Sequence, residues 1–378
     1  MNPKVDSLMS EGEGIVLFRP YVSPTAAMSV AKTLSTRWIG QGPQVEEFER
    51  QFSTRLAGDL PCAATNSGTS ALHLAMLLAG IGPGDEVITT IFTCTATNMP
   101  VLYCGATPVF ADIQPTTLNI DPVSVRAKLT EKTKAIVCVP YGGLPCDMDE
   151  LRQIADEAEI PLIQDAAHAM GAQYHGVSIV KHATYSMFSF QAIKHFTTGD
   201  GGMLVLPDHH QIEDAKLLRW FGIDRSAKQK GIWENDITRV GYKYQMTDIA
   251  ATMGLAALGD WDTIWQHRRK LLALYELEFD GIDTVEFVGG GFDDRTHAAW
   301  LCTVLVDDRV GCQAMLRSKG IEATQVHYRN DRYSIMGGRR DDMPGMDSVD
   351  DKYLVLPMHM QVTEDDVYRI TDALRTGW

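Results

Sequence analysis

The chain has 378 residues, of which 45% are hydrophobic and 22% charged, a mixture that can bury a large domain and a smaller one. Its formal net charge of −15 argues against general nucleic-acid binding, which needs basic surfaces. We expect no membrane contact, because no apolar run reaches the roughly 18 residues of a membrane span and the N-terminal residues lack a signal-peptide core. The seven scattered cysteines form no C-x-x-C pair, so we expect a cytoplasmic location and neither a metal site nor disulfides.

Short apolar runs alternate with helical patterns through the first two thirds of the chain. Strands are expected over residues 84–92, 106–113, 134–141, 160–169 and 184–190, and helices over 95–105 and 147–159. In "DMDELRQIADEAE" one helix face is apolar, formed by Met148, Leu151, Ile154 and Ala155. This alternation predicts an α/β fold with a mostly parallel sheet flanked by helices, in which ligands bind at the carboxyl ends of the strands.

The pattern changes after Thr247. Residues 248–279 predict a long helix with a break near Gly259 and Asp260. A strand over 297–308, a helix over 309–320 and a last helix with a Thr-x-x-Asp cap are expected to follow. We therefore expect a large domain in residues 1–255, including the N-terminal segment, and a smaller C-terminal α+β domain in residues 256–378.

The stretch "TNSGTSALHLA" predicts an anion site. It places Ser67, Gly68 and Thr69 at the start of a helix, where unpaired amides and the positive end of the helix dipole attract a phosphate. Gly68 lets the phosphate approach the backbone closely. An ordinary helix cap is the alternative explanation for the same residues.

A second stretch, "IPLIQDAAHA", ends a predicted strand with Asp165. A buried carboxylate needs a partner, and the protonated ring nitrogen of a cofactor is one; capping the next helix is the alternative. His168 follows about one helical turn later and can face the same site, or it can be a structural core residue.

The third stretch, "SFQAIKHFTTGDGG", surrounds Lys194 with apolar residues. Burial lowers the pKa of a lysine, and a neutral amine can form a Schiff base with a carbonyl, whereas a surface lysine would have no such role. Taken together, these stretches offer the anchors of pyridoxal 5'-phosphate (PLP). The helix start and Ser189 would hold the phosphate, Asp165 the ring nitrogen, and Lys194 the aldehyde carbon.

In this order, the motifs "GPQVEEFERQF", "NSGTSALHLA", "GDEVITT", "DAAHAMGA", "SFQAIKHFTTGDGG" and "PMHM" resemble the PLP-dependent sugar aminotransferases of the DegT/StrS type, within aspartate-aminotransferase-like fold type I. The resemblance runs from about Ile39 to the last helix. It implies that Lys194 forms the internal aldimine and shuttles the proton, that Asp165 pairs with the pyridine nitrogen, and that His168 contacts the phenolic oxygen of the cofactor. It also implies phosphate contacts from Gly68, Thr69 and Ser189.

The implied reaction moves an amino group, usually from L-glutamate, to a keto group of a nucleotide-linked deoxysugar, in a homodimer whose active sites are shared between subunits. The sequence departs from the family pattern at three places. Cys94 stands where members have an aromatic residue that stacks on the cofactor. In "GYKYQM", Lys243 and Gln245 replace an asparagine and an arginine, and Lys243 of the partner subunit can still meet the phosphate as a point charge. The usual "HLYG" reads "PYGG", with Pro140 and Gly142 in place of histidine and tyrosine.

The segment "QVHYRNDRYSIM" concentrates candidate substrate-binding side chains, namely His327, Arg329, Asn330 and Arg332. They can bind a nucleotide diphosphate or the glutamate carboxylate, or they can form a solvated charged loop. Other functions stay open: an aminotransferase for keto-cyclitols, or a catalytically degenerate PLP-fold regulator. A dehydratase of the same family would have histidine in place of Lys194, and a lyase or desulfurase would need a reactive cysteine on a mobile loop, for which the sequence offers no strong candidate.

Overall fold

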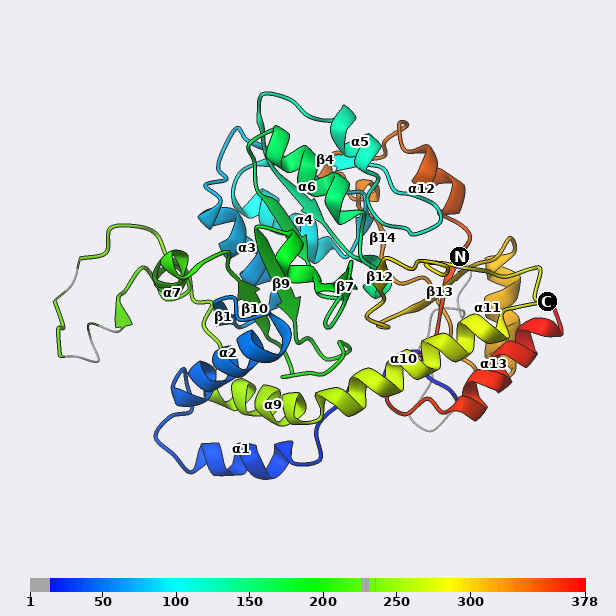
Figure 1. Cartoon of the computed structure of the whole chain (residues 1–378), viewed down its shortest axis with the longest axis horizontal. Coiled ribbons are helices and arrows are strands. Elements are labelled where there is room, and N and C mark those ends of the chain that lie inside the picture. The colour runs from blue at the N-terminus through cyan, green and yellow to red at the C-terminus, as the bar shows by residue number, and fades with distance from the viewer. Residues whose placement is uncertain (1–13, 226, 228–230, 235) are drawn as a thin grey trace.

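The computed structural model describes residues 14–225, 227, 231–234 and 236–378. Figure 1 shows a layered α/β body and a C-terminal part, joined by the long helix α10 (Trp261–Glu278). The body is built on a sheet with helices on both faces, so the predicted α/β fold is confirmed.

A seven-stranded sheet forms the centre of the body. In spatial order its strands are β1 (Cys62–Thr65), β10 (Gly202–Val205), β9 (Tyr185–Ser189), β6 (Leu162–Asp165), β5 (Thr133–Cys138), β2 (Glu86–Thr90) and β4 (Thr107–Ala111). Strand β10 is antiparallel to both of its neighbours, and the other six strands run in one direction. Their carboxyl ends therefore meet at one edge, where an α/β sheet binds its ligands.

Helices cover both faces of this sheet because successive strand residues point to opposite sides. On β9, Phe188 packs with α2 (Pro43–Leu56), whereas Met187 packs with α3 (Gly68–Leu78). The other helices of the body are α1 (Ala26–Leu34), α4 (Thr95–Tyr103), α5 (Pro122–Ala127), α6 (Met148–Glu157), α7 (Ile212–Leu218) and α9 (Asp248–Gly259). The apolar face predicted for α6 is confirmed, since all four of its named residues are buried. Within the described residues, no helix combines the length and the apolar character needed to cross a membrane.

The C-terminal part is built on a small antiparallel sheet of three strands. In spatial order these are β11 (Glu286–Phe287), β13 (Cys302–Leu305) and β15 (Tyr353–Leu356). Helices α10, α11 (Arg309–Ser318) and α13 (Glu364–Arg375) share a core with this sheet. A short helix, α12 (Pro344–Val349), precedes β15 in the sequence. A further short sheet joins β7 (Gln173–Tyr174), β8 (Val177–Ser178) and β12 (Arg295–Thr296). The predicted cap of α13 is confirmed as a capping box between Thr363 and Asp366.

The expected helix break is confirmed at Asp260, between α9 and α10. The expected division after residue 255 falls inside α9, which packs on α1 and α2 of the body. At the other end of the described chain, Ile15 pairs with Ile321 of the C-terminal part. The division into residues 1–255 and 256–378 stays a prediction.

One expected strand is shorter than its sequence pattern suggests. The apolar run over 297–308 forms a strand only at β13. Just before it, the amide of Trp300 donates a hydrogen bond of 3.1 Å to the carbonyl oxygen of Gly142, in a different loop. The backbone at Trp300 therefore bonds a loop of the body and does not extend the small sheet.

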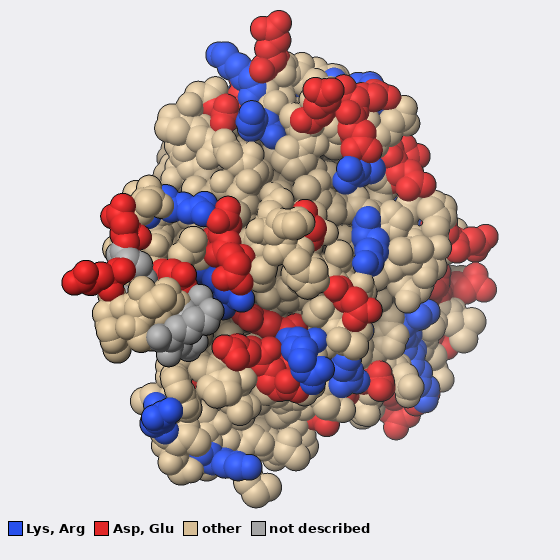
Figure 2. Space-filling model, turned by 60° about the vertical axis from the view of Figure 1, so that its left-hand side comes forward, with Lys and Arg blue, Asp and Glu red and all other residues tan. Residues whose placement is uncertain are grey.

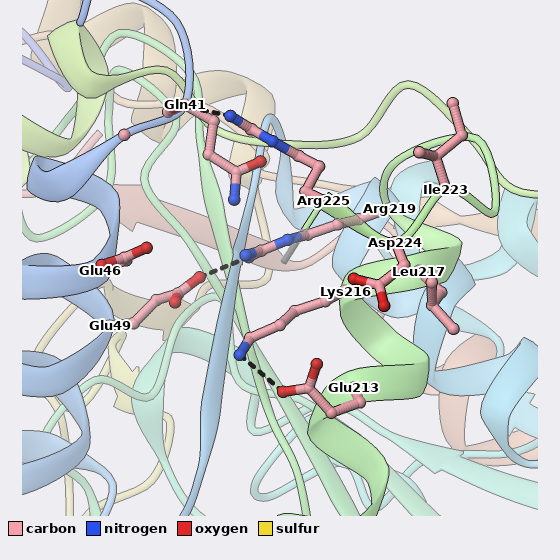
Figure 3. A pocket seen from close by; sticks show the side chains of 11 residues that line it. Gln41, Glu46, Glu49, Glu213, Lys216, Leu217, Arg219, Ile223, Asp224 and Arg225 are labelled. Carbon is pink, nitrogen blue, oxygen red and sulfur yellow. Dashed lines mark hydrogen bonds and ion pairs between the residues drawn. The ribbon is translucent and has the colours of Figure 1, made fainter. Parts of the chain in front are cut away.

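A cavity of about 390 Å³ lies between α2 and α7, and Figure 3 shows the side chains that line it. Its charged lining includes Glu46, Glu49, Glu213, Lys216, Arg219 and Arg225, none of them a predicted site residue. At its base Arg219 forms an ion pair with Glu49, and both side chains bond the backbone of Ala64 on β1, at 2.8 Å each. This buried ion pair links two helices to the strand that leads into α3.

Replacing Arg219 by methionine is expected to lower the free energy of unfolding by about 3–5 kcal/mol, because Glu49 would keep a buried charge without its partner. Urea unfolding would measure the change. Arg50→Met, on the helix that carries Glu49, is the matched control, since Arg50 pairs with Glu47 in solvent and should change stability little. Equal losses in both variants would contradict a special role for the buried pair.

Candidate active site

The carboxyl edge of the sheet brings most of the predicted site residues together. Ser67 follows β1, Asp165 ends β6 and Ser189 ends β9. Lys194 lies in the loop that connects β9 to β10, and its side chain is buried. Because these strands are neighbours and their ends share one edge, residues far apart in the sequence surround one space.

The first turn of α3 has the features of a phosphate site. Ser67 is its N-cap, and the Ser67 hydroxyl accepts a hydrogen bond of 3.1 Å from the amide of Ser70. Gly68 and Thr69 then lie in the turn whose amides have no intrahelical acceptor. A Cβ atom added at Gly68 would lie 3.0 Å from the Cβ atom of Ser189, so glycine allows this serine to sit directly beside the helix start. The same helix start can therefore be capped by Ser67 and still bind an anion through its free amides.

We expect Gly68→Ala to weaken PLP binding about tenfold, the equivalent of one hydrogen bond to a charged group at roughly 1.5 kcal/mol, because Ser189 must move away from the helix start. Titration of the cofactor-free protein with PLP would measure the dissociation constant. Gly259→Ala is the control, since a Cβ there meets nothing within 4 Å. A dissociation constant unchanged in both variants would remove Gly68 from the phosphate site.

Asp165 is buried at the end of β6, and its carboxylate accepts two hydrogen bonds. Its Oδ2 atom accepts a hydrogen bond of 2.7 Å from the Thr97 hydroxyl, and its Oδ1 atom accepts one of 3.1 Å from the Ala167 amide. Burial raises the pKa of this carboxyl group, while those two donors and the charge of Lys194 act in the opposite direction. A protonated ring nitrogen would complete the set, because it adds a cation to a carboxylate that is costly to bury.

The amine of Lys194 is held in a desolvated position. Burial lowers its pKa to about 8, although the nearby Asp165 and Cys94 favour the charged form. Its Nζ atom lies 3.8 Å from the centre of the Trp300 indole ring. At a pKa of about 8, roughly a tenth of the amine is neutral at pH 7 and able to attack a carbonyl.

Two histidines stand next to this lysine. The Nε2 atoms of His168 and His327 are 3.2 Å apart, and the His168 ring stacks on Trp300 with 3.9 Å between centroids. Burial lowers the pKa of both imidazoles, that of His327 to about 3, so they are neutral at physiological pH. Among the described residues, the buried Nδ1 atom of His168 has no hydrogen-bond partner, which leaves it available to a cofactor oxygen.

A strand of the C-terminal part closes one side of the site. β14 (Tyr328–Arg329) pairs with β3 (Phe92–Thr93), the strand that leads directly to Cys94. Cys94 is the N-cap of α4 and lies close enough to influence the charge of Lys194. The position expected for an aromatic partner of the cofactor ring is therefore at the site, but it carries a thiol.

The four predicted substrate-binding residues lie in different surroundings in this structure. Arg329 is buried and bonds both oxygens of Asp331, at 2.6 and 2.7 Å. Asn330 is also buried, and its amide donates to the carbonyl oxygens of Thr93 and Tyr328. Arg329 and Asn330 thus have intrachain partners, and their role in substrate binding stays a prediction.

The exposed Arg332 lies 4.4 Å from the ring centre of Tyr328, whereas His327 lies beside His168. Lys243 is exposed as well, with its Nζ atom 3.8 Å from the Trp220 ring centre. The role predicted for Lys243, a contact with the cofactor phosphate of a partner subunit, stays a prediction.

Sequence reasoning missed Trp300 and Thr97. Trp300 falls within the strand expected over 297–308, and Thr97 within the helix expected over 95–105. A signal for Thr97 exists in hindsight, since a hydroxyl one turn into a helix can reach a neighbouring strand end. The sequence offers no comparable signal for Trp300, because its contact with Lys194 depends on the loop conformation.

The residues present fit PLP. Gly68 lets Ser189 lie against the helix start, where a Cβ atom would crowd it, Asp165 is a buried carboxylate, and Lys194 has a desolvated amine. Among the described residues, the Nδ1 atom of His168 has no hydrogen-bond partner. These groups match the phosphate, the ring nitrogen, the aldehyde and the phenolic oxygen of the cofactor.

Comparisons with known proteins agree with this fit. Residues 21–375 match the model of the DegT/DnrJ/EryC1/StrS aminotransferase family. The spore coat polysaccharide biosynthesis protein SpsC of Bacillus subtilis is 34% identical, over 94% of this chain and 95% of its own. The crystal structure of the sugar aminotransferase CalS13 from Micromonospora echinospora has a TM-score of 0.91 at 34% identity, covering 96% of this chain and 100% of CalS13. Spr1654 from Streptococcus pneumoniae in its PLP form has a TM-score of 0.89 at 29% identity, covering 96% and 98%. The chain therefore belongs to the DegT/DnrJ/EryC1/StrS family, and it is a PLP-dependent aminotransferase of fold type I.

Proposed function

We propose that this enzyme transfers an amino group from L-glutamate to a keto group of a nucleotide-linked deoxysugar. The observation that carries the proposal is the convergence of Lys194, Asp165 and the start of α3 at one sheet edge. The similarity to a sugar aminotransferase over nearly the whole chain supports a sugar as the acceptor. The nucleotide and the glutamate are the family expectations that the test below addresses.

Each side chain has a defined task in this proposal. PLP, when bound, supplies an aldehyde carbon and an electron-accepting ring. The first turn of α3 and Ser189 bind its phosphate, and Asp165 holds the proton on its ring nitrogen. Lys194 would hold the aldehyde carbon and, as a free amine, would accept and return the proton of the substrate carbon at its Nζ atom. His168 orients the ring through its phenolic oxygen, and His327 faces the incoming substrate.

A homodimer with shared sites is part of the proposal. Large exposed apolar side chains occur on and after α1 and again on the segment that follows α7; they include Met28, Leu34, Ile39, Phe221, Trp233 and Val240. Figure 1 shows that this second segment extends away from the body. Apolar residues exposed in this way are typical of surfaces that a partner covers. Lys243 pairs with Trp220, just after α7, and a partner subunit could use its exposed amine at a phosphate.

The surface gives no support to a nucleic-acid substrate. Figure 2 shows acidic and basic side chains interspersed on one face of the molecule, with acidic groups prominent. Binding to a phosphate backbone would need an extended basic surface. A small anionic substrate needs only local positive groups, and the free cysteines are compatible with the reducing cytoplasm where nucleotide sugars are used.

Absorbance and mass spectrometry together test the proposal. The PLP-loaded enzyme should absorb near roughly 410–430 nm, a property of the cofactor bound to a lysine, and L-glutamate should bleach this band. A panel of nucleotide-linked keto-sugars and keto-cyclitols would then be assayed for the mass change from ketone to amine. Amination of a cyclitol ketone alone would replace the proposed acceptor. A band that does not respond to L-glutamate would exclude this donor, and a protein without the band would be a degenerate, regulatory member of the fold.

A further inference from the structure

The Lys194 amine lies against the face of the Trp300 indole ring. The Nζ atom lies 3.8 Å from the ring centre, within the range of a cation–π contact. The indole is buried, and its Nε1 atom donates a hydrogen bond of 3.0 Å to the carbonyl oxygen of Ile193, the residue before Lys194. The ring is thus fixed to the same backbone that carries the lysine.

The backbone around Trp300 is held in an unusual conformation. Ala299 has a φ of 55°, in the left-handed region that residues with a side chain rarely adopt. The amides of Ala298 and Trp300 donate to the carbonyl oxygens of Gly143 and Gly142, at 2.8 and 3.1 Å. Such a conformation persists only where its surroundings determine it, so further contacts must hold this loop.

Arg268 supplies these contacts from α10. Its side chain is buried, and its Nη1 atom donates to the carbonyl oxygens of Ala299, Trp300 and Met358, at 3.2, 3.4 and 3.0 Å. All its described hydrogen bonds go to backbone carbonyls, although a buried guanidinium is usually paired with a carboxylate. A second clamp comes from His195, whose Nε2 atom is 2.7 Å from the carbonyl oxygen of Ala298.

We propose that Trp300 is a positioning residue for Lys194: its ring holds the amine whenever the amine is not bonded to the cofactor, and Arg268 keeps the ring in place. The inference uses the proposed role of Lys194 and is independent of the proposed sugar. In a transamination cycle the lysine must leave the cofactor and return as a base. A ring face beside it keeps the amine within reach and prevents it from pairing with Asp165.

The charge of the amine reports on this contact. The titratable groups that influence Lys194 among the described residues are Asp165 from β6, Cys94 at the start of α4, and the histidines His168, His195 and His327. A variant of Trp300 keeps all of these groups in the chain, and Trp300→Phe also keeps a ring on which His168 can stack. A ring face favours the ammonium form, so removing the ring should lower the pH at which the amine loses its proton.

Competitive labelling of the full-length, cofactor-free protein tests the proposal. The protein is acetylated over a range of pH, and the labelled fraction of Lys194 is measured by peptide mass spectrometry. We expect Trp300→Met to lower the midpoint by about half a pH unit to one unit, the size expected for a desolvated cation–π contact. Trp300→Phe retains a ring face and should keep the midpoint close to that of the unchanged protein.

Arg268 is tested in the same way, with thermal unfolding recorded for every variant. Arg268→Met should lower the Lys194 midpoint in the same direction, and should add nothing when combined with Trp300→Met, because both changes remove one contact. Arg268→Lys keeps a charge and some donors, and serves if the methionine variant does not fold; it should give a smaller shift. A midpoint that is unchanged or raised in folded Trp300→Met protein would overturn the proposal, and so would a further decrease in the double variant. Failure of the sugar assays would leave these labelling results unaffected.

Discussion

Replacing Lys194 by alanine is expected to lower kcat by about 10⁴-fold or more. Proton transfer by a positioned side chain alone contributes about 10²–10⁴-fold, and the variant also loses the amine that holds the cofactor aldehyde. Steady-state kinetics with a keto-sugar acceptor would measure the loss. The visible absorbance band of the bound cofactor should be absent as well, which separates a chemical defect from poor binding of the sugar.

Lys194→Arg is the control for this prediction. Arginine keeps the positive charge that Asp165 and Cys94 favour, but it stays protonated and cannot act as a nucleophile or a base. We expect a loss of the same order as in the alanine variant. Normal transamination by either variant would remove Lys194 from the mechanism.

The second large effect is expected for Asp165→Asn, with kcat about 10²–10³-fold lower, in the range seen when one preorganised electrostatic partner is removed. The amide has nearly the shape of the carboxyl group and can still accept from the Thr97 hydroxyl, now 2.7 Å from Asp165 Oδ2. It has no charge to keep a proton on the ring nitrogen of the cofactor. Activity should be compared at saturating PLP so that weaker cofactor binding does not contribute.

Thr97→Val provides a graded comparison. It leaves the Asp165 charge in place and removes one of its two described donors, so a loss of only about tenfold is expected, the cost of one such hydrogen bond. If Asp165→Asn and Thr97→Val lose the same activity, the charge of Asp165 is not what matters. An unchanged kcat in Asp165→Asn would likewise show that catalysis does not depend on the charge of Asp165.

The positions of the proposed cofactor anchors could be predicted, because each depends on local sequence. Gly68 follows a helix cap, Asp165 ends an apolar run, and Lys194 lies in a short apolar stretch before a glycine-rich turn. Each pattern fixes the position of its residue on a strand end or a helix start, and a parallel sheet then gathers those ends at one edge. Local rules and tertiary structure agree at these positions.

The substrate side of the site was less predictable. His327 has a φ of 66° and Ala299 one of 55°, conformations that sequence propensity does not indicate and that only the packed fold imposes. From the sequence alone, Arg329 is a cation close to His327 that could bind an anionic ligand. In the fold it is satisfied by Asp331, two positions further along the chain. A charge pattern does not distinguish a cation that awaits a ligand from one already paired inside the protein.

The bonds of Asn330 have a consequence for how the molecule behaves as a whole. This residue belongs to the C-terminal part, yet its backbone amide bonds Ile91 at 2.7 Å and its side chain bonds Asn98 at 3.0 Å, both in the body. Because these polar groups are buried, separating the two parts would leave them without partners. The walls of the site should therefore exist before any ligand arrives, and melting of either part should propagate through this junction to the other.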